Sequence, residues 1–566
     1  MRTQWRSGVA LAAVLVLGGC GGGGGGTGQP DAGNTPVCTI SGVSLTGSAP
    51  SVAPSQAVNL TATVTQGAGS SGCNGGVVWN VNPSTTPLNI SGLTATFTTA
   101  VPGAYTINVT SKDDTTKSAS FQLTVRAPAT CGTPNGTVVT HTGNITADES
   151  WAGNGVTHSV TSSVRIKAPA TVTIQACAIV SLAQTAEIGV EGDPTGGRPA
   201  RLVAAGTDDQ TGFVSFLPAV TGQFWGTLRG YNEQSFIELH HAGLVGAGAG
   251  LVGYRNSAIV MEGPGLNAPG PLPLLTVDHV AIDHPRGGGV YLDGMAAFTA
   301  GSTWLGIGGA QDYPLSLFIM AAGSIPQMTV QDDPAQATHF HEAWINPSRP
   351  NVIADTTING NIPLYLEASV NVVQTGSVIT PLGVTLTVLP GAELRFKPGA
   401  NLRMVFGGRG NTSGNAVGRL IALGTATSPI RFTSAAAVPA AGDWAGVQLP
   451  TAPGSQMAFN IIEYAGGFSG VVSNNCRPSG SADNAALIVG GPDFTPSGSM
   501  IVSSIIQFSA GHGIDATWEA GTPNDPNLAD SANFNVFTAI GGCKQTFNAL
   551  VPGVGSCPTG GGCTEQ

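Results

Sequence analysis

The sequence predicts an all-β protein, in which a small N-terminal β-sandwich precedes a long, duplicated solenoid of stacked β-coils. The first observation is composition: of 566 residues, 21 are basic and 32 acidic, 9% in total, whereas 82 are glycine. This is too apolar for a disordered chain and is typical of extended β structure. The second observation is period-two alternation of apolar residues, with almost no helical periodicity. The third is an ordered series of internal matches, which indicates a duplication.

Residues 1–20 have the features of an export signal. Arg2 and Arg6 give a positive start, and Val9–Leu17 is an apolar segment too short to span a bilayer as a helix. It is followed by Gly-Gly before Cys20 and so resembles the bacterial lipobox, whose cysteine is diacylated. The resemblance implies a signal peptide over residues 1–19 and lipidation at Cys20. The alternative is an ordinary signal peptide with an incidental cysteine and cleavage elsewhere.

Residues 20–36 are expected to be a tether, because Gly21–Gly26 is an uninterrupted glycine run. Gly21, rather than aspartate, follows the cysteine, as in lipoproteins that are sorted to the outer membrane. We therefore expect an outer-membrane lipoprotein of the bacterial envelope, which faces either the periplasm or the cell surface. The lipid is its expected contact with the membrane.

Residues 37–127 predict the β-sandwich. Gly, Pro and Asp turns separate segments of alternating apolar residues, namely Leu60–Val64, Val77–Val81, Tyr105–Val109 and Phe121–Val125. The sequences Val78–Val81 and Pro102–Ile107 resemble bacterial immunoglobulin-like domains of the Big type, which implies a spacer or binding stalk. Trp79 is expected to pack in the core against a disulfide, and a sugar-stacking role is the alternative.

The chain after residue 127 contains the duplication. Matching segments keep their order at slowly growing offsets: Arg201–Thr207 with Arg419–Thr425 at 218, Phe224–Gly226 with Asp443–Ala445 at 219, and Ile237–Leu239 with Ile462–Tyr464 at 225. Chance matches would not stay ordered. The two halves are expected at residues 128–350 and 351–566. Within each half, short Val, Ile, Leu and Thr strands recur between Gly, Asn and Pro, so that stacked coils bury a core that no single coil can bury.

The second half also resembles a known family. The segments Leu386–Phe396, Gly418–Ser434 and Asp443–Leu449 are similar to the pectate-lyase-like right-handed parallel β-helix of many bacterial surface lipoproteins. The resemblance implies a duplicated right-handed parallel β-helix behind the immunoglobulin-like domain. A propeller or several sandwiches is the alternative architecture, although blade-like repeats are absent from the sequence.

Eight cysteines remain after Cys20, an even number that favours disulfides in an exported chain. Their positions within the segments suggest the pairs Cys38–Cys73, Cys131–Cys177, Cys476–Cys543 and Cys557–Cys563. The last pair would close a short C-terminal loop. Zinc binding by these thiols is disfavoured because no Cys-x-x-Cys spacing occurs.

Histidines are the candidate metal ligands. His339 and His341 would point to the same face of a strand, and such a pair can chelate a metal ion. His240 and His279 are 39 residues apart, a spacing that places them on nearby coils. No third ligand is evident, so solvent-facing or turn histidines are the alternative, and no cofactor is expected.

Fragments of β-helix hydrolase motifs occur in the wrong order and are read as coincidence: Asp208-Asp209, Asp332-Asp333, Gly511-His512-Gly513 and Arg165-Ile166-Lys167. The tryptophans form no regular stripe in the sequence. They are expected to pack or cap coils, with a glycan-binding face as the alternative.

The expected function is non-enzymatic: a lipid-anchored envelope or surface protein with a binding, adhesion or structural role, whose ligand is polysaccharide or another envelope component. Net charge is −11 and no basic run exceeds two residues, so nucleic acid is excluded as a partner. The alternative is a carbohydrate-active enzyme, a polysaccharide lyase or glycoside hydrolase. Carboxylates that converge with Arg or Lys from adjacent coils, within about 5–10 Å in one groove, would count against the non-enzymatic role and favour the enzyme.

Overall fold

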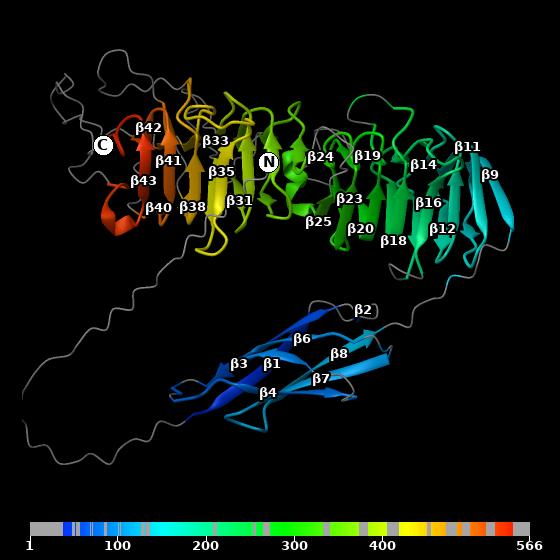
Figure 1. The fold of residues 1–566 in the computed structure, drawn as a ribbon, viewed down its shortest axis with the longest axis horizontal. Coiled ribbons are helices and arrows are strands. Elements are labelled where there is room, and N and C mark those ends of the chain that lie inside the picture. The colour runs from blue at the N-terminus through cyan, green and yellow to red at the C-terminus, as the bar shows by residue number, and fades with distance from the viewer. Residues whose placement is uncertain are drawn as a thin grey trace, which may run out of the picture. The chain divides into compact units, whose positions relative to one another are not determined.

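The computed structural model divides into two compact units, residues 1–127 and 128–566. It describes residues 38–47, 51–52, 57–67, 69–70, 72–83, 88–99, 101, 103–125, 131, 136–207, 212–251, 253, 256–263, 272–331, 340–372, 383–404, 418–449, 454–470, 484–489, 499–516 and 527–546. Almost all regular structure in these residues is β-strand, with antiparallel sheets in the first unit and parallel sheets in the second (Figure 1). No helix in these ranges is long and apolar enough to cross a membrane.

The first unit is a sandwich of two four-stranded sheets, ordered β1-β3-β6-β5 and β2-β8-β7-β4. Its strands are β1 (Ile40–Gly47), β2 (Ser51–Val52), β3 (Val58–Gln66), β4 (Val77–Asn82), β5 (Asn89–Ser91), β6 (Thr94–Phe97), β7 (Gly103–Ser111) and β8 (Ser118–Val125). Period-two alternation turns one face of each strand inward, as Val58, Leu60 and Ala62 of β3 and Tyr105 and Ile107 of β7 illustrate.

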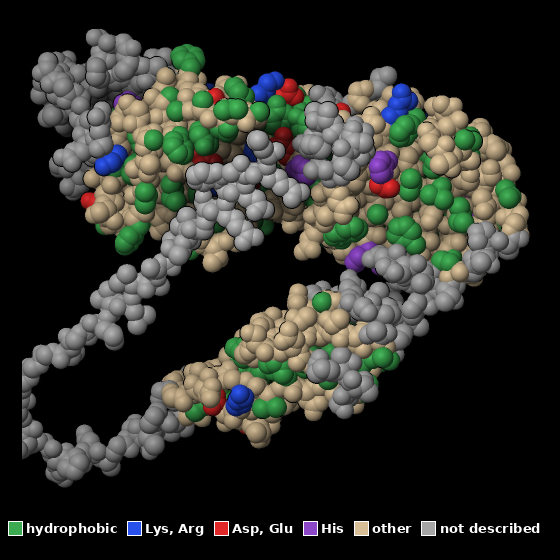
Figure 2. Space-filling view, in the orientation of Figure 1, with side chains coloured by type: hydrophobic (Ala, Val, Ile, Leu, Met, Phe, Trp, Pro, Cys, Tyr) green, Lys and Arg blue, Asp and Glu red, His purple; other side chains and the backbone are tan. Residues whose placement is uncertain are grey.

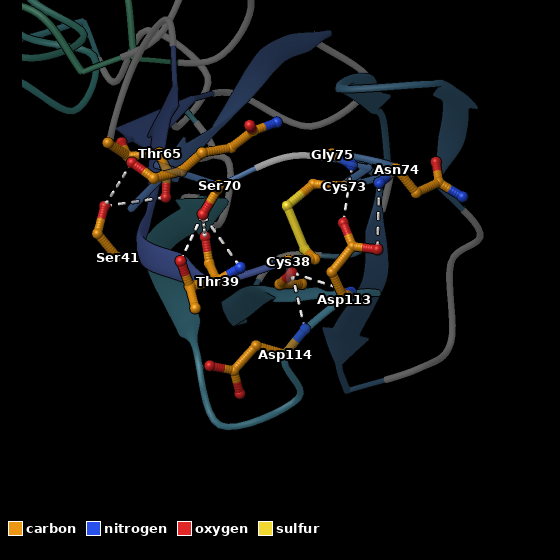
Figure 3. The surroundings of a disulfide bond; sticks show 12 residues. Cys38, Thr39, Ser41, Thr65, Ser70, Cys73, Asn74, Gly75, Asp113 and Asp114 are labelled. Carbon is orange, nitrogen blue, oxygen red and sulfur yellow. Dashed lines mark hydrogen bonds between the residues drawn. A yellow bond between two sulfur atoms is a disulfide. The ribbon is translucent and has the colours of Figure 1, made fainter. Parts of the chain in front are cut away.

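A disulfide between Cys38 and Cys73 links the segment before β1 to the loop before β4, and so ties the two sheets together (Figure 3). The Asp113 carboxylate braces this loop by accepting hydrogen bonds from the backbone N–H groups of Asn74 and Gly75 at 3.2 and 2.8 Å. The half-buried Trp79 packs against both core clusters of the sandwich and donates its indole N–H to the Gly92 carbonyl at 3.2 Å. Trp79 is therefore a packing residue.

The second unit is a parallel β-helix, and its first part winds into one continuous sheet (Figure 1). Its strands are β9 (Val138–Ile145), β10 (Glu149–Trp151), β11 (Thr157–Lys167), β12 (Thr171–Gln175), β13 (Ile179–Leu182), β14 (Ile188–Glu191), β15 (Ala200–Ala205), β16 (Val214–Pro218), β17 (Leu228–Gly230), β18 (Ser235–Val245), β19 (Ile259–Glu262), β20 (Leu272–Asp283), β21 (Val290–Asp293), β22 (Ala296–Phe298), β23 (Trp304–Gly308), β24 (Leu315–Leu317), β25 (Gln327–Gln331) and β26 (Ala343–Ile345), with a 3-10 helix η2 (Ile319–Ser324).

From β27 onward the coil has three sides, of which two are separate parallel sheets and the third continues the sheet of the first part. The strands are β27 (Asn351–Val352), β28 (Thr356–Ile358), β29 (Leu364–Leu366), β30 (Val370–Val372), β31 (Val384–Val388), β32 (Glu393–Phe396), β33 (Leu402–Met404), β34 (Gly418–Leu423), β35 (Ile430–Ser434), β36 (Val447–Leu449), β37 (Gln456–Ala458), β38 (Asn460–Glu463), β39 (Ala485–Val489), β40 (Ile501–Val502), β41 (Ile505–Ser509), β42 (His512–Ala516) and β43 (Val536–Ile540), with η3 (Ser531–Asn533). Strands three apart in number pair, as β29-β32-β35-β38 do.

One continuous hydrophobic core fills the β-helix from Ile145 to Leu528. The duplicated tryptophans have the same role in it. Trp225 and Trp444 are fully buried, and each indole N–H donates to a backbone carbonyl further along the chain, that of Val245 at 2.7 Å and that of Glu463 at 2.8 Å. The matched segments therefore lie in equivalent environments.

The N-terminal end of the β-helix is closed by a disulfide and by an aromatic stack. Cys131, which precedes β9, is bonded to Cys177 in the turn after β12. Trp151 stacks on both His141 and His158, with ring centroids 3.9 and 5.2 Å away, and the two imidazoles are themselves joined by a 2.9 Å hydrogen bond. At the other end Cys543 is disulfide-bonded as well. The predicted partners and sites at Cys20, Cys476, Cys557 and Cys563 lie outside the described residues.

Candidate functional site

Parallel stacking aligns outward-facing side chains into columns, and one such column crosses the second half of the β-helix. The register of β26, β29, β32 and β35 places Trp344, Tyr365, Arg395 and Thr433 side by side in turn. The flanking residues on each strand, such as Leu394 and Phe396 of β32, point into the core. The column therefore passes from aromatic to charged residues along one face.

A groove of about 630 Å³ opens over the charged part of this column. Glutamate, arginine and tyrosine side chains supply most of its polar wall, and small residues of the segment after β35 close one side. The charged and aromatic residues of the lining are Glu342, Glu393, Arg395, Arg431, Glu463 and Tyr464. They come from β26, β32, β35 and β38, or from residues adjacent to those strands, so that successive coils build the groove.

Two guanidinium groups join the three carboxylates. Arg395 binds Glu393 at 2.6 Å and Glu342 at 3.2 Å. Arg431 pairs with Glu463 one coil further along. Arg395 thus brings the carboxylates of Glu342 and Glu393 together in one groove, as a carbohydrate-active enzyme requires of its two carboxylates. The groove therefore counts in favour of the enzymatic alternative.

The carboxylates differ in exposure. The Glu463 side chain is 5% exposed and also accepts hydrogen bonds from Thr433 at 2.9 Å and Gln507 at 2.7 Å. The side chains of Glu342 and Glu393 are 16% and 28% exposed, so a ligand in the groove reaches these two. Burial raises the pKa of the Glu342 carboxyl above its usual value, although Arg395 acts in the opposite direction.

Aromatic rings border the groove. Tyr464 lies at its wall and stacks on Phe508 of the next coil, with ring centroids 5.2 Å apart and planes 11° apart. Phe508 is 36% exposed, so the pair presents an accessible aromatic edge. Further along the column Tyr313 contacts Tyr365 and Phe340 at centroid distances of 5.5 and 4.4 Å. Rings and ion pairs together are the side chains that sugar-binding sites use.

A second cluster lies in the first half, where β18 and β20 pair. The register aligns His240 with Asp278, and His241 and His279 follow them. Asp278 contacts His279 Nδ1 at 2.9 Å and His240 Nδ1 at 3.4 Å, and it accepts a hydrogen bond from the Thr303 hydroxyl at 2.6 Å. Among the described residues, His241, Asp278 and His279 form a group whose ligand atoms lie within 4.8 Å of one another. His240 and His279 are thus on neighbouring coils, as their spacing predicts.

Another group of potential ligand atoms, Cys38, Cys73 and Asp113, is of a different kind. Its two sulfur atoms form the disulfide of the sandwich (Figure 3), and a disulfide offers no thiolate to a metal ion. This group therefore has a structural role.

The remaining sequence candidates are dispersed. His341 lies exposed next to Glu342, and His339 is outside the described residues, so their proposed chelate stays a prediction. Arg165 and Lys167 of β11 form ion pairs with Glu187 and Glu191 at 2.7 and 2.5 Å. His512 of β42, near the far end of the β-helix, accepts a hydrogen bond from the Cys543 N–H at 2.9 Å. Asp208, Asp209, Asp332 and Asp333 are outside the described residues.

The sequence did not reveal the groove. Arg395 and Glu342 are 53 residues apart, and Arg431 and Glu463 are 32 apart. Among the charged residues of the groove, only Glu463 was marked in the sequence, because it lies in the duplicated segment Ile462–Tyr464. Figure 2 shows how sparse charged side chains are on the surface it displays, so an Arg–Glu pair one coil apart is itself a usable signal.

A scan against protein-family models, a search of curated proteins and a search of solved structures each found no match.

Proposed function

We propose that this protein binds a neutral polysaccharide in the groove between β32 and β38 and presents that groove from a lipid-anchored position in the bacterial envelope. The observation that carries the proposal is the groove itself, in which Arg395, Arg431 and accessible glutamates lie beside the Tyr464–Phe508 stack. Guanidinium and carboxylate groups hydrogen-bond to sugar hydroxyls, and the apolar face of a sugar ring packs on an aromatic ring.

The charge of the groove favours a neutral glycan over an acidic one. Its lining has three glutamates and two arginines, and both arginines are already paired with glutamate. The chain as a whole carries a net charge of −11. A uronate chain would meet excess negative charge without an unpaired guanidinium in the lining to neutralise it.

The envelope location rests on sequence resemblance. The lipobox-like segment before Cys20 supplies the anchor, and the following glycines supply the tether. The sandwich supports a Big-type immunoglobulin-like stalk, because Tyr105 near the start of β7 donates its hydroxyl to the Val101 carbonyl at 2.8 Å, in the manner of the tyrosine corner of such domains. The three-sided parallel coil agrees with a pectate-lyase-like β-helix behind that stalk.

A panel of immobilised glycans tests the binding proposal. The purified full chain is run by affinity electrophoresis through gels that contain neutral glucans, mannans or xylans, and through matched gels with polygalacturonate. Retardation by at least one neutral polysaccharide, with none by polygalacturonate, is expected. Retardation by the acidic glycan alone, or by none of the panel, would contradict the proposal.

Glycoside hydrolysis at the same groove is the second candidate, because Glu342 and Glu393 converge on Arg395. Burial raises the pKa of the Glu342 carboxyl, as suits a general acid, and Glu393 is placed to act as the second carboxylate. We rank hydrolysis second because Arg395 forms ion pairs with both carboxylates, and these pairs occupy the groups that the reaction needs.

Product analysis separates the two candidates. Each polysaccharide is incubated with the wild type and assayed for new reducing ends and for unsaturated products. Binding without either product supports the non-enzymatic role. Release that is lost in Glu342→Gln and Glu393→Gln, while retardation in the gels persists, would establish the hydrolase and overturn our first choice.

Labelling with radioactive palmitate tests the anchor independently. The label is expected on the wild type and lost from Cys20→Ala, whereas Cys543→Ala serves as the matched cysteine control. Label that persists in Cys20→Ala would show that Cys20 is not the lipidated residue.

A further inference from the structure

Strands β18 and β20 each bend at a turn between their two halves. These two turns bring histidines of neighbouring coils together. His241 and His279 adopt left-handed backbone conformations, with φ of 43° and 55°. Non-glycine residues rarely take this conformation, although histidine tolerates it better than most. The two imidazoles stack with centroids 4.9 Å apart and planes 13° apart. Both side chains are partly exposed, so an ion in solution reaches them.

Asp278 is held at the centre of this cluster. Thr303 from the next coil donates a 2.6 Å hydrogen bond to one carboxylate oxygen, and His279 Nδ1 lies 2.9 Å from the same oxygen. His240 Nδ1 lies 3.4 Å from the other oxygen. Burial alone would raise the pKa of the Asp278 carboxyl, but its hydrogen bonds with His240, His279 and Thr303 lower that pKa well below the usual range.

The donor atoms have the chemistry of a transition-metal site. Each of His241, Asp278 and His279 offers one ligand atom, and these three atoms lie within 4.8 Å of one another. Neutral imidazole nitrogen with carboxylate oxygen is a ligand set that Zn²⁺ and Cu²⁺ accept, with bonds of about 2.0–2.2 Å to zinc. The χ2 torsion of histidine has a broad minimum, so that the two rings can rotate toward a shared ion.

We propose that His241, Asp278 and His279 bind one divalent transition-metal ion of the zinc or copper type, with His240 orienting the carboxylate. Carboxylate–histidine contacts of this kind fix ring orientation at metal sites. Three protein ligands leave a coordination position open to water or to a ligand atom. The site is independent of the glycan groove, because it is built by β18 and β20 rather than by β32 to β38.

The chain contains a matched control in Asp283 and His284. This pair repeats the Asp-His order five residues later, His284 also has a left-handed φ of 48°, and its Nδ1 lies 2.7 Å from Asp283. The three-ligand group among the described residues includes His241 and His279 but not His284. The Asp283–His284 pair thus keeps the Asp-His order and the left-handed backbone but does not belong to a three-ligand group among the described residues.

The experiment is calorimetric titration of the tag-free, chelator-treated full chain with Zn²⁺, followed by electron paramagnetic resonance of the Cu²⁺ form. We expect one saturable site, with nitrogen couplings in the Cu²⁺ spectrum. His241→Asn and His279→Asn should each weaken Zn²⁺ binding at least tenfold, since asparagine keeps the left-handed conformation but is a poor ligand. Asp278→Asn should also weaken it, and His284→Asn should leave it unchanged.

Two results would overturn the proposal. One is the absence of saturable Zn²⁺ or Cu²⁺ binding by the wild type. The other is wild-type affinity in both His241→Asn and His279→Asn, which would assign any binding to other histidines of the chain. Circular dichroism and the thermal midpoint of each variant distinguish a lost ligand from a lost fold.

Discussion

The turn shared by β18 and β20 and the turn shared by β38 and β41 have the same backbone conformation and different side chains. In the first, His241 and His279 have φ of 43° and 55°, and in the second Tyr464 and Phe508 have φ of 59° and 54°. The rings stack at 4.9 Å in the first turn and at 5.2 Å in the second. The two turns therefore share a left-handed backbone conformation, and the residues placed on it decide the chemistry.

The residues that precede these rings show the difference most clearly. In the first turn they are His240 and Asp278, which form a partly exposed pair of opposite charge when the imidazole is protonated. In the second turn they are Glu463 and Gln507, which lie one above the other and are joined by a 2.7 Å hydrogen bond. The first arrangement suits a metal ion, whereas the second closes the charged wall of a groove.

The largest expected effect concerns the buried carboxylate of the second turn. Glu463→Ala should lower the free energy of unfolding by about 2 kcal/mol. It removes a carboxylate that is 5% exposed and leaves the hydrogen-bond donors of Arg431, Thr433 and Gln507 without this acceptor. Glu238→Ala is the control from the first copy: its pair with Arg201 is 30% exposed on the glutamate side and should contribute less than about 1 kcal/mol. Denaturant unfolding measures the free energy of unfolding of both variants. An equal decrease in the two variants would contradict the expected difference between the buried and the exposed glutamate.

A smaller effect should follow from the shared backbone. His241→Val and Tyr464→Val should each cost about 1–2 kcal/mol, because a β-branched residue is strained at a left-handed φ. His241→Asn and Tyr464→Asn should cost less, since asparagine tolerates this conformation. Thermal midpoints of the four variants test whether the turns are equivalent. If valine and asparagine behaved alike at either position, that turn would not keep the left-handed conformation in solution.

The smallest effect is the pH dependence of the first turn. A hydrogen bond to Asp278 raises the pKa of His240 above its usual value of about 6.5, against the effect of burial. Its stabilisation is therefore fully present below that unfolded-state pKa and is lost as pH rises through the folded-state pKa. The difference in thermal midpoint between the wild type and His240→Gln should shrink from pH 5 to pH 8. A difference that grows with pH would show the opposite shift.

The comparison with His240→Gln is necessary because the stack of His141, Trp151 and His158 at the N-terminal end of the β-helix also changes the stability with pH. Burial lowers the pKa of both His141 and His158, so their neutral forms stabilise the fold above about pH 6.5, and this contribution is lost as pH falls. The wild type alone therefore sums two trends of opposite sign. Comparison with His240→Gln at each pH isolates the turn of β18 and β20.

The amino-acid sequence predicted the architecture because the features that determine it are short patterns within the sequence. Alternation at period two marks the inward face of each strand, and ordered matches such as Trp225 with Trp444 mark equivalent coils. The groove was not predictable in the same way. Its ion pairs join residues one or more coils apart, and coil length changes with each loop, so the spacing from Glu342 to Arg395 has no fixed value to search for. The pair of His240 and His279 was easier to anticipate, because their spacing of 39 residues corresponds to neighbouring coils.

Binding of a neutral glycan in the groove between β32 and β38 is tested most sharply by calorimetry with the neutral oligosaccharide that the glycan panel selects. We expect saturable binding to the wild type and at least tenfold weaker binding to Tyr464→Ala, whose ring lines the groove. Phe534→Ala is the control, because Phe534 is an aromatic residue 74% exposed and outside the groove lining, and it should bind as the wild type does. Wild-type affinity in Tyr464→Ala, or an equal loss in Phe534→Ala, would contradict the assignment of the glycan to this groove.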